Sequence, residues 1–222
     1  MIKIAHRGAS AYEPENTLQS FRKALEMNAD GIELDVHCSS DGQIVVIHDE
    51  TVDRTTIGTG TVNALTLAEI KSFSGNLVPS LYEVLHLVDR KALVNIELKG
   101  DGTAVPVLKI IEDFVQGKGW KYKQFLLSSF NWNALQQVRD QNPKIPVGVL
   151  TATDLDLAIG FSKFINAETI HPYFHLLDKQ KTLKMQQQGF EVMTWTVNEP
   201  EDIERVKSYH VNGIITDYPD RL

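Results

Sequence analysis

The feature that most constrains the fold is a regular alternation of short β-rich runs with segments of helical periodicity. The β-rich runs recur along the whole chain, at Ile2–His6, Gly31–His37, Ile44–His48, Leu93–Leu98, Phe125–Ser129, Val147–Leu150, Thr169–His171, Val192–Val197 and Gly213–Thr216. Between most of them, apolar residues are spaced three and four positions apart, as on one face of a helix. Strands that alternate with helices predict parallel βα units.

Helix-start signals support this alternation. The signals combine a capping side chain with a polar residue three positions on, or with a proline in the first turn. They are Asn16 with Gln19, Thr66 with Glu69, Ser80 with Glu83, and Asn198 before Pro200.

Nine strand candidates are one too many for a barrel of eight parallel strands, and Asp41-Gly42 resolves the count. An Asp-Gly pair between two β-rich runs is a hairpin signal, so Gly31–His37 and Ile44–His48 are expected to be antiparallel neighbours. The return strand would bring His48 back to the level of the barrel mouth. Eight parallel strands in a chain of 222 residues predict an α/β fold, a TIM-type (β/α)8 barrel with a small insertion after the second-strand hairpin.

The chain shows no linker rich in Pro, Gly or Ser that would divide it. We therefore expect one catalytic domain over residues 1–222. The least regular stretch, residues 50–80, is expected to be an insertion over the barrel mouth, with one short helix near Leu67–Phe73.

Composition and net charge limit the kinds of molecule that the protein is expected to bind and the compartment that it fits. The net charge of −7 argues against nucleic-acid binding, because an acidic surface repels the phosphate backbone. Cys38 is the only cysteine, which excludes an intrachain disulfide and fits a reducing compartment. Neither a signal peptide nor a run of about 18 apolar residues is seen. We expect a soluble, cytoplasmic protein without stable membrane insertion, and the oligomeric state stays open.

Charged residues at alternate positions in two apolar runs indicate a candidate functional site. Glu33 and Asp35 share one strand face, and Glu97 and Lys99 share another, because side chains alternate along a strand. Such charges are least costly at the C-terminal mouth of a barrel. Converging carboxylates there would repel one another unless a cation binds, and all-oxygen ligands favour Mg²⁺ or Ca²⁺ over zinc. The pattern leaves a second interpretation open, in which Glu33 and Asp35 only form salt bridges with Arg or Lys.

Two histidines are expected at the same mouth. His6 ends the first strand and His48 ends the hairpin's return strand. Histidine suits proton transfer near neutral pH, so the pair favours a catalytic site. Arg7 offers a planar fork for phosphate or carboxylate, and Gly8 would let backbone N–H groups approach an anion.

An ordered set of short motifs then resembles the glycerophosphodiester phosphodiesterase family. The resemblance covers nearly the whole chain, and the set is specific although each piece alone is weak. The motifs are His6-Arg7-Gly8, Pro14-Glu15-Asn16-Thr17, Glu33-Leu34-Asp35-Val36, His48-Asp49, Glu97-Leu98-Lys99, Thr194-Trp195-Thr196-Val197-Asn198 and Gly213-Ile214-Ile215-Thr216-Asp217-Tyr218-Pro219.

The resemblance implies metal-dependent hydrolysis of a small-molecule glycerophosphodiester to sn-glycerol 3-phosphate and an alcohol, on a TIM-type barrel. By position, His6 and His48 match the family's general acid/base pair. Glu33, Asp35 and Glu97 match its ligands for a divalent cation, Mg²⁺ or Ca²⁺. We expect His6 to act as the acid and His48 as the base, and the reverse assignment stays open. The first nucleophile, water or the glycerol 2-hydroxyl, stays open.

The resemblance also implies substrate contacts. Arg7 and Lys99 match the phosphate-binding cations, and Trp195 matches an aromatic residue that packs near the glycerol. Glu15 is expected to brace Arg7, and Asn16 to cap the first helix.

Weaker candidates follow other strand ends. Phe130, Trp132 and Tyr173 could line the alcohol pocket, and His171 could support the site from behind. Ser128 and Ser129 could bond phosphate or cap the helix that starts near Asn131, and capping is the preferred interpretation.

Two alternatives remain. A lysophospholipase D or a phosphoinositide-type barrel phosphodiesterase would share two histidines and an anionic substrate but yield a different product. A non-enzymatic binding module on the same fold would have no need for His6, His48 and three carboxylates together.

Overall fold

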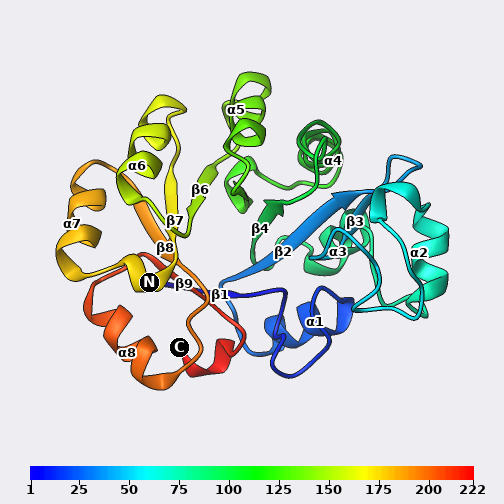
Figure 1. Ribbon diagram of the computed structural model, residues 1–222, viewed down its shortest axis with the longest axis horizontal. Helices are drawn as coiled ribbons and strands as arrows, with labels where there is room; N and C mark the ends of the chain where they lie inside the picture. The colour runs from blue at the N-terminus through cyan, green and yellow to red at the C-terminus, as the bar shows by residue number, and fades with distance from the viewer.

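Eight parallel strands close into a barrel in the computed structural model, which describes all of residues 1–222. Closure is made by β1, which pairs with β9 on one side and with β2 on the other (Figure 1). The parallel strands are β1 (Ile2–Ala5), β2 (Gly31–Cys38), β4 (Leu93–Leu98), β5 (Phe125–Ser129), β6 (Val147–Thr151), β7 (Thr169–Pro172), β8 (Glu191–Thr194) and β9 (Gly213–Thr216). The TIM-type prediction is confirmed.

The ninth strand, β3 (Ile44–Val46), pairs antiparallel with β2, as the Asp-Gly hairpin signal predicts. It ends before His48, where the prediction placed its end. One further backbone hydrogen bond, from the Ile47 N–H to the Asp35 carbonyl, continues the pairing beyond Val46.

The strand predicted at Val192–Val197 also ends earlier than expected. β8 stops at Thr194, and beyond it only one isolated bridge joins Trp195 to Tyr173. The neighbouring β7 ends at Pro172, whose nitrogen has no hydrogen to donate to a longer ladder.

Helices surround the barrel and follow the strands in alternation (Figure 1). They are α1 (Leu18–Glu26), α2 (Leu67–Phe73), α3 (Leu81–Val88), α4 (Ala104–Gly117), α5 (Trp132–Gln141), α6 (Leu155–Phe164), α7 (Lys179–Gln187) and α8 (Pro200–Ser208). No helix is both long enough and apolar enough to cross a lipid bilayer.

Two of the four helix-start predictions are confirmed and two are wrong. Thr66 with Glu69 and Ser80 with Glu83 form reciprocal capping boxes at α2 and α3. At α1 the cap is instead Thr17 with Ser20 as its partner, and at α8 the residue before Pro200 is the cap. In both wrong cases the predicted asparagine lies one residue before the actual cap. Its side-chain amide instead donates to an aspartate at the barrel mouth.

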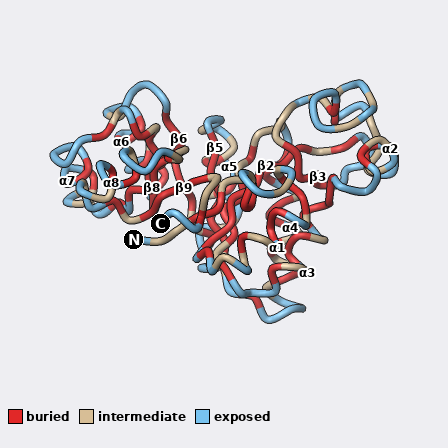
Figure 2. Tube along the Cα trace, turned by 90° about the horizontal axis from the view of Figure 1, so that it is seen from below, coloured by how far each residue is buried: buried red, intermediate tan, exposed pale blue.

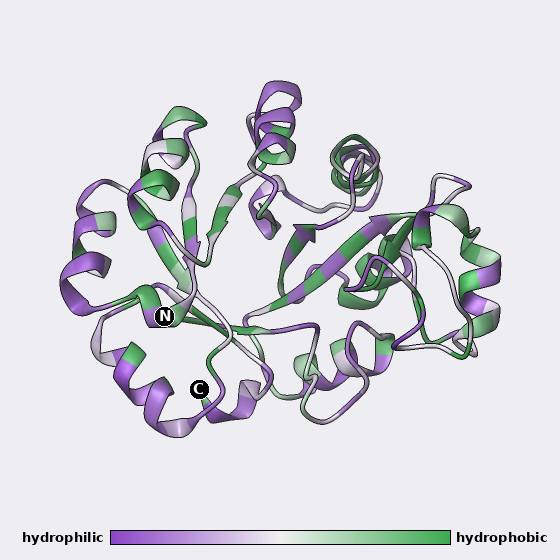
Figure 3. Ribbon diagram, in the orientation of Figure 1, coloured by the Kyte–Doolittle hydropathy of each residue, from purple (hydrophilic) through white to green (hydrophobic).

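Burial separates the barrel into an apolar outer layer and a mixed interior. A cluster of 46 buried apolar residues fills the space between strands and helices, and Figure 2 shows the strands as the buried centre of the chain. A small apolar cluster of Ile4, Leu126, Met193 and Ile215 comes from the opposite strand faces. Figure 3 shows polar positions interleaved with the apolar ones along β2. The interior-facing strand positions therefore carry the polar side chains of the site.

Residues 50–80 have their own small core. They contain a 3₁₀ turn at Val62–Ala64 and the helix α2, whose bounds are the predicted ones. An apolar cluster separate from the main one joins this segment to β3, through Val45, Ile47, Val52, Val62, Ile70 and Val78.

The capping box at α3 gives a direct stability prediction. The Ser80 hydroxyl accepts a hydrogen bond from the Glu83 backbone N–H, which would otherwise lack a helical partner. Ser80→Ala is expected to lower the free energy of unfolding by about 1 kcal/mol, measured by urea denaturation. Ser80→Thr, which keeps the hydroxyl, is the control, and equal stability of the alanine variant and the wild type would contradict the assignment.

Candidate active site

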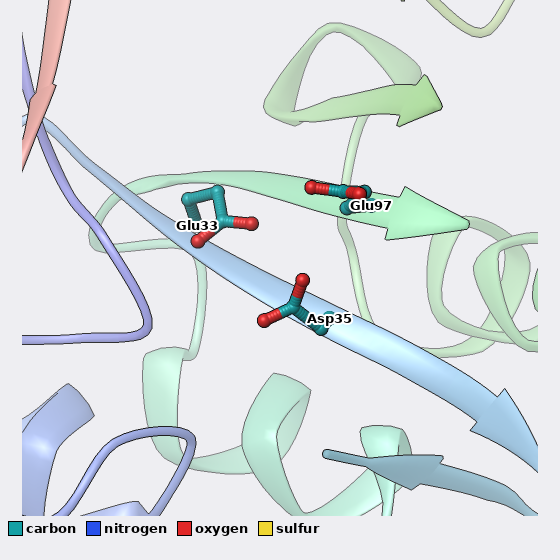
Figure 4. Close-up of side chains that lie close together, drawn as sticks. All are labelled: Glu33, Asp35 and Glu97. Carbon is teal, nitrogen blue, oxygen red and sulfur yellow. The ribbon is translucent and has the colours of Figure 1, made fainter. Parts of the chain in front are cut away.

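Three carboxylates meet inside the mouth of the barrel. Glu33 and Asp35 come from β2, and Glu97 from the neighbouring β4, where it is in register with Asp35. One oxygen from each lies within 4.8 Å of the others, and Figure 4 shows the three side chains turned toward one another. Glu33 and Asp35 are buried, with 3% and 1% exposed surface. Three buried negative charges at this separation repel strongly.

The protonation of the cluster reflects that repulsion. Burial, followed by the charge of Asp35, raises the pKa of Glu33, and the same two causes in the same order raise the pKa of Glu97. A divalent cation would stabilise the ionised forms. Because all three side chains offer oxygen, the cluster fits a hard cation of the Mg²⁺ or Ca²⁺ type.

Two cationic side chains border the cluster. Arg7 Nε lies 3.3 Å from Asp35 Oδ2, and Lys99 Nζ lies 3.2 Å from Glu97 Oε1 and 3.9 Å from Asp35 Oδ1. The salt-bridge interpretation is therefore correct for Asp35, whereas Glu33 forms no salt bridge with Arg or Lys. With all three carboxylates ionised, these two cations would leave one negative charge, so the ion pairs are compatible with a further cation at the cluster.

Backbone and amide groups orient the carboxylates. The Arg7 N–H donates to Glu33 Oε2 at 3.0 Å, and the Asn16 amide donates to Asp35 Oδ2 at 2.9 Å. Arg7 and Asn16 both have positive φ, at 54° and 56°, a backbone conformation that non-glycine residues adopt at a cost and mostly at functional sites. Gly8 follows with φ of 82°, and a Cβ there would lie 2.6 Å from the Ser20 carbonyl carbon. Gly8 thus permits close packing of this loop on α1.

His6 is held by a carboxylate from the end of β9. Its Nδ1 lies 2.7 Å from Asp217 Oδ1, and Asp217 is itself fixed by the Ser10 hydroxyl and the Asn198 amide. Burial alone would lower the pKa of His6, but the Asp217 hydrogen bond and the charge of Glu33 outweigh it, and the pKa is raised. His6 is therefore biased toward the protonated form.

His48 is also held by an aspartate, but its pKa is shifted in the opposite direction from that of His6. Its Nδ1 lies 2.6 Å from Asp49 Oδ1, and Arg54 bridges Asp49 to Glu15. Glu15 also accepts from Arg7 at 3.0 Å, which confirms that it braces Arg7. Burial lowers the pKa of His48 more than Asp49 raises it, so this ring is biased toward the neutral form.

One cavity of about 110 Å³ brings the two histidines together with the carboxylates. Its lining includes every predicted site residue except Asp35, which lies behind the surface: His6, Arg7, Glu33, His48, Glu97, Lys99 and Trp195. A larger cavity of about 520 Å³ shares His48 and Lys99 with it and extends past Asp49, Glu50 and Asp101.

An aromatic group forms one wall of the small cavity. Trp195 lies edge-to-face with Phe130 at 5.4 Å between ring centres and packs on Tyr173 at 5.4 Å. Its indole N–H donates to the His171 carbonyl at 2.8 Å. The expectation for Trp132 is wrong, because as the first residue of α5 it stacks on Phe161 of α6 instead.

The other weak candidates do not reach the cavity in the expected way. His171 is fully buried and bonded to Thr169, and burial lowers its pKa to about 3. It supports Trp195 only through its carbonyl group. The Ser129 hydroxyl donates to the Leu98 carbonyl and accepts from the Asn131 N–H at the start of α5, whereas Ser128 lines the cavity.

Sequence reasoning missed the groups that hold the histidines. Arg54 was given no role, Asn198 was expected only to cap a helix, and Asp217 and Asp49 were noted only as members of motifs. One signal could have found two of them, since Asp217 directly follows β9 and Asp49 follows the predicted end of the hairpin strand at the barrel mouth. Arg54 reaches the site across a loop, which no spacing rule predicts.

Comparison with known proteins agrees with this geometry. Residues 6–221 match the Glycerophosphoryl diester phosphodiesterase family. A glycerophosphodiester phosphodiesterase from Caldanaerobacter subterraneus subsp. tengcongensis is 39% identical, with 100% of this chain and 96% of the relative covered.

Solved structures give the same result. A glycerophosphodiester phosphodiesterase from Thermotoga maritima superposes with a TM-score of 0.85 at 26% identity, over 99% of this chain and 96% of the other. An Oleispira antarctica phosphodiesterase, in complex with the product sn-glycerol-3-phosphate, superposes with a TM-score of 0.88 at 26% identity, over 100% and 94%. The chain therefore belongs to the glycerophosphoryl diester phosphodiesterase family.

Proposed function

We propose that this enzyme hydrolyses glycerophosphodiesters to sn-glycerol 3-phosphate and an alcohol, by histidine acid/base catalysis beside a divalent cation. The observation that carries the proposal is the pairing of two carboxylate-held imidazoles with a buried three-carboxylate cluster in one cavity. The product bound to the Oleispira antarctica phosphodiesterase supports the same chemistry.

Glu33, Asp35 and Glu97 would hold the cation, Mg²⁺ or Ca²⁺. When bound, such an ion supplies positive charge that stabilises the transition state of phosphoryl transfer. Arg7 and Lys99, which border the cluster, would contact the phosphate oxygens. Trp195 would pack against the glycerol carbons.

The two histidines would divide the proton transfers. The raised pKa of His6 favours the acid that protonates the leaving alkoxide, and the lowered pKa of His48 favours the base. Both rings bond an aspartate through Nδ1, which leaves Nε2 of each for the reaction. The base would accept a proton from the nucleophile, which is water or the glycerol 2-hydroxyl.

We further propose that residues 1–222 act as one catalytic domain in the cytoplasm, with residues 50–80 as an insertion beside the mouth. Arg54, from that insertion, bridges Asp49 and Glu15, which supports a role in shaping the site. The partner is a small molecule, and the net charge of −7 disfavours nucleic acid.

A substrate panel tests the reaction against its alternatives. Glycerophosphocholine, lysophosphatidylcholine and phosphatidylinositol would be offered with Mg²⁺ or Ca²⁺, and the products identified by mass spectrometry. We expect glycerol 3-phosphate from the first. Lysophosphatidic acid or a cyclic inositol phosphate as the main product would instead support a lysophospholipase D or a phosphoinositide-type enzyme.

The Asp217–His6 hydrogen bond gives a prediction about pH. Asp217→Asn keeps a side chain that can accept from Nδ1 but removes the negative charge, so the pKa of His6 is expected to fall. Since an acid must be protonated, the alkaline limb of the pH–kcat profile should move to lower pH. We also expect kcat to fall about ten- to a hundredfold, as for the loss of one charge-assisted hydrogen bond. A lower kcat with an unmoved alkaline limb would show that Asp217 has only a structural role.

A further inference from the structure

The lining of the small cavity contains two polar side chains with buried atoms that no protein group satisfies. The Asn95 side chain makes no hydrogen bond, its Oδ1 is buried without a partner, and the Ser128 hydroxyl is likewise unpaired. Each residue is only 1% exposed, and both line the cavity. Buried polar groups in folded proteins almost always have partners, so an unpaired pair facing one cavity indicates a ligand.

Their positions place them directly beside the carboxylate cluster. Asn95 is in register with Glu33, and Ser128 is in register with Glu97. The charged neighbours are already engaged, because Glu33 accepts from the Arg7 N–H and Glu97 pairs with Lys99. Asn95 and Ser128 thus offer free, uncharged donors and acceptors, which suit a hydroxyl group.

The sizes of the two cavities indicate which end of the substrate each cavity would hold. The small cavity of about 110 Å³ meets the larger one of about 520 Å³ at His48 and Lys99. The phosphate must reach the small cavity to contact both histidines, because His6 lines only that one of the two cavities and His48 lines both. The alcohol varies between substrates and fits the larger space, whereas the glycerol is constant and small. Apolar and aromatic side chains, Leu150, Ile215, Phe130 and Trp195, complete the small cavity.

We propose that Asn95 and Ser128 form a specificity subsite that binds the terminal hydroxyl of the glycerol moiety. The inference rests on the proposed function and adds the part of the substrate that is recognised. A site built to bond a hydroxyl rejects analogues that lack it, by about 10⁴-fold in favourable cases, because its own buried polar groups are then left unpaired.

The test compares two substrates in the same protein. One is glycerophosphocholine, and the other is its analogue with 2-hydroxypropyl in place of glyceryl, which keeps the 2-hydroxyl but lacks the terminal one. The wild type is expected to favour glycerophosphocholine by at least about 10²-fold in kcat/KM. Asn95→Leu, which keeps a side chain branched at Cγ but removes the amide, and Ser128→Ala should each reduce that ratio by about ten- to a hundredfold. Because the ratio is taken within one preparation, partial misfolding does not affect it.

Ser162→Ala is the matched control. Ser162 on α6 is also fully buried with an unpaired hydroxyl, but it does not line this cavity. Its substitution should leave the ratio unchanged. A ratio unchanged in Asn95→Leu and Ser128→Ala, whether both rates fall together or neither falls, would overturn the subsite and leave only a structural or water-binding role. Failure of the wild type to hydrolyse either substrate would instead contradict the proposed function.

Discussion

Replacement of His6 or His48 by alanine is expected to lower kcat by about 10²–10⁴-fold, the usual contribution of a positioned general acid or base. The two rings lie in one cavity, and each is held through Nδ1 by its own aspartate. The pKa of His6 is raised and that of His48 is lowered, so the two rings favour different proton transfers. The measurement is steady-state release of glycerol 3-phosphate at saturating substrate and divalent ion.

The control for this prediction is His86→Ala. His86 is exposed on α3 and packs against Tyr82 and Phe114, away from the cavity. Its loss should change kcat less than twofold or so, within the range of remote surface substitutions. A loss below tenfold in both the His6 and the His48 variant would exclude the acid/base pair.

Replacement of Glu33 by glutamine is expected to lower activity roughly 10²-fold or more at a fixed ion concentration. A bound cation contributes several kcal/mol to the transition state, and each 1.4 kcal/mol or so is a factor of ten. Glutamine can still accept from the Arg7 N–H, so the local geometry is kept while one anionic ligand is lost. Glu204→Gln, an exposed change on α8, is the charge-matched control.

Thermal unfolding separates ion binding from catalysis. Without divalent ion, Glu33→Gln should melt at a higher temperature than the wild type, because it removes a carboxyl group whose ionised form is disfavoured by burial and by the charge of Asp35. With ion, the wild type should gain stability by about 2.7 kcal/mol at a hundredfold excess over Kd, and the variant should gain less. Equal responses to Mg²⁺ or Ca²⁺ in both proteins would remove Glu33 from the ligand set.

The fold was accessible from sequence because its signals are local and repeated. All nine strands were predicted, and the Asp41-Gly42 turn assigned β3 to an antiparallel position. The errors occurred where tertiary partners override local pattern. Asn16 and Asn198 read as helix caps, yet their amides bind Asp35 and Asp217.

The site was predictable to the extent that strand ends define the barrel mouth. Strand register brings Glu33, Asp35 and Glu97 together, and this follows from alternation and parallel pairing. The bridge from Asp49 through Arg54 to Glu15 includes a contact between residues 39 positions apart, Arg54 and Glu15. This bridge depends on the tertiary path of residues 50–80, and the local sequence pattern of that segment does not predict the path.

Metal-dependent hydrolysis is tested most directly by phosphorus NMR of glycerophosphocholine mixed with the enzyme, first with EDTA and then with Mg²⁺ or Ca²⁺. We expect the diester resonance to persist with EDTA. After addition of the ion, it should be replaced by that of sn-glycerol 3-phosphate, directly or through a transient cyclic phosphate. Persistence of the diester with either ion, or equally fast conversion in EDTA, would contradict the account.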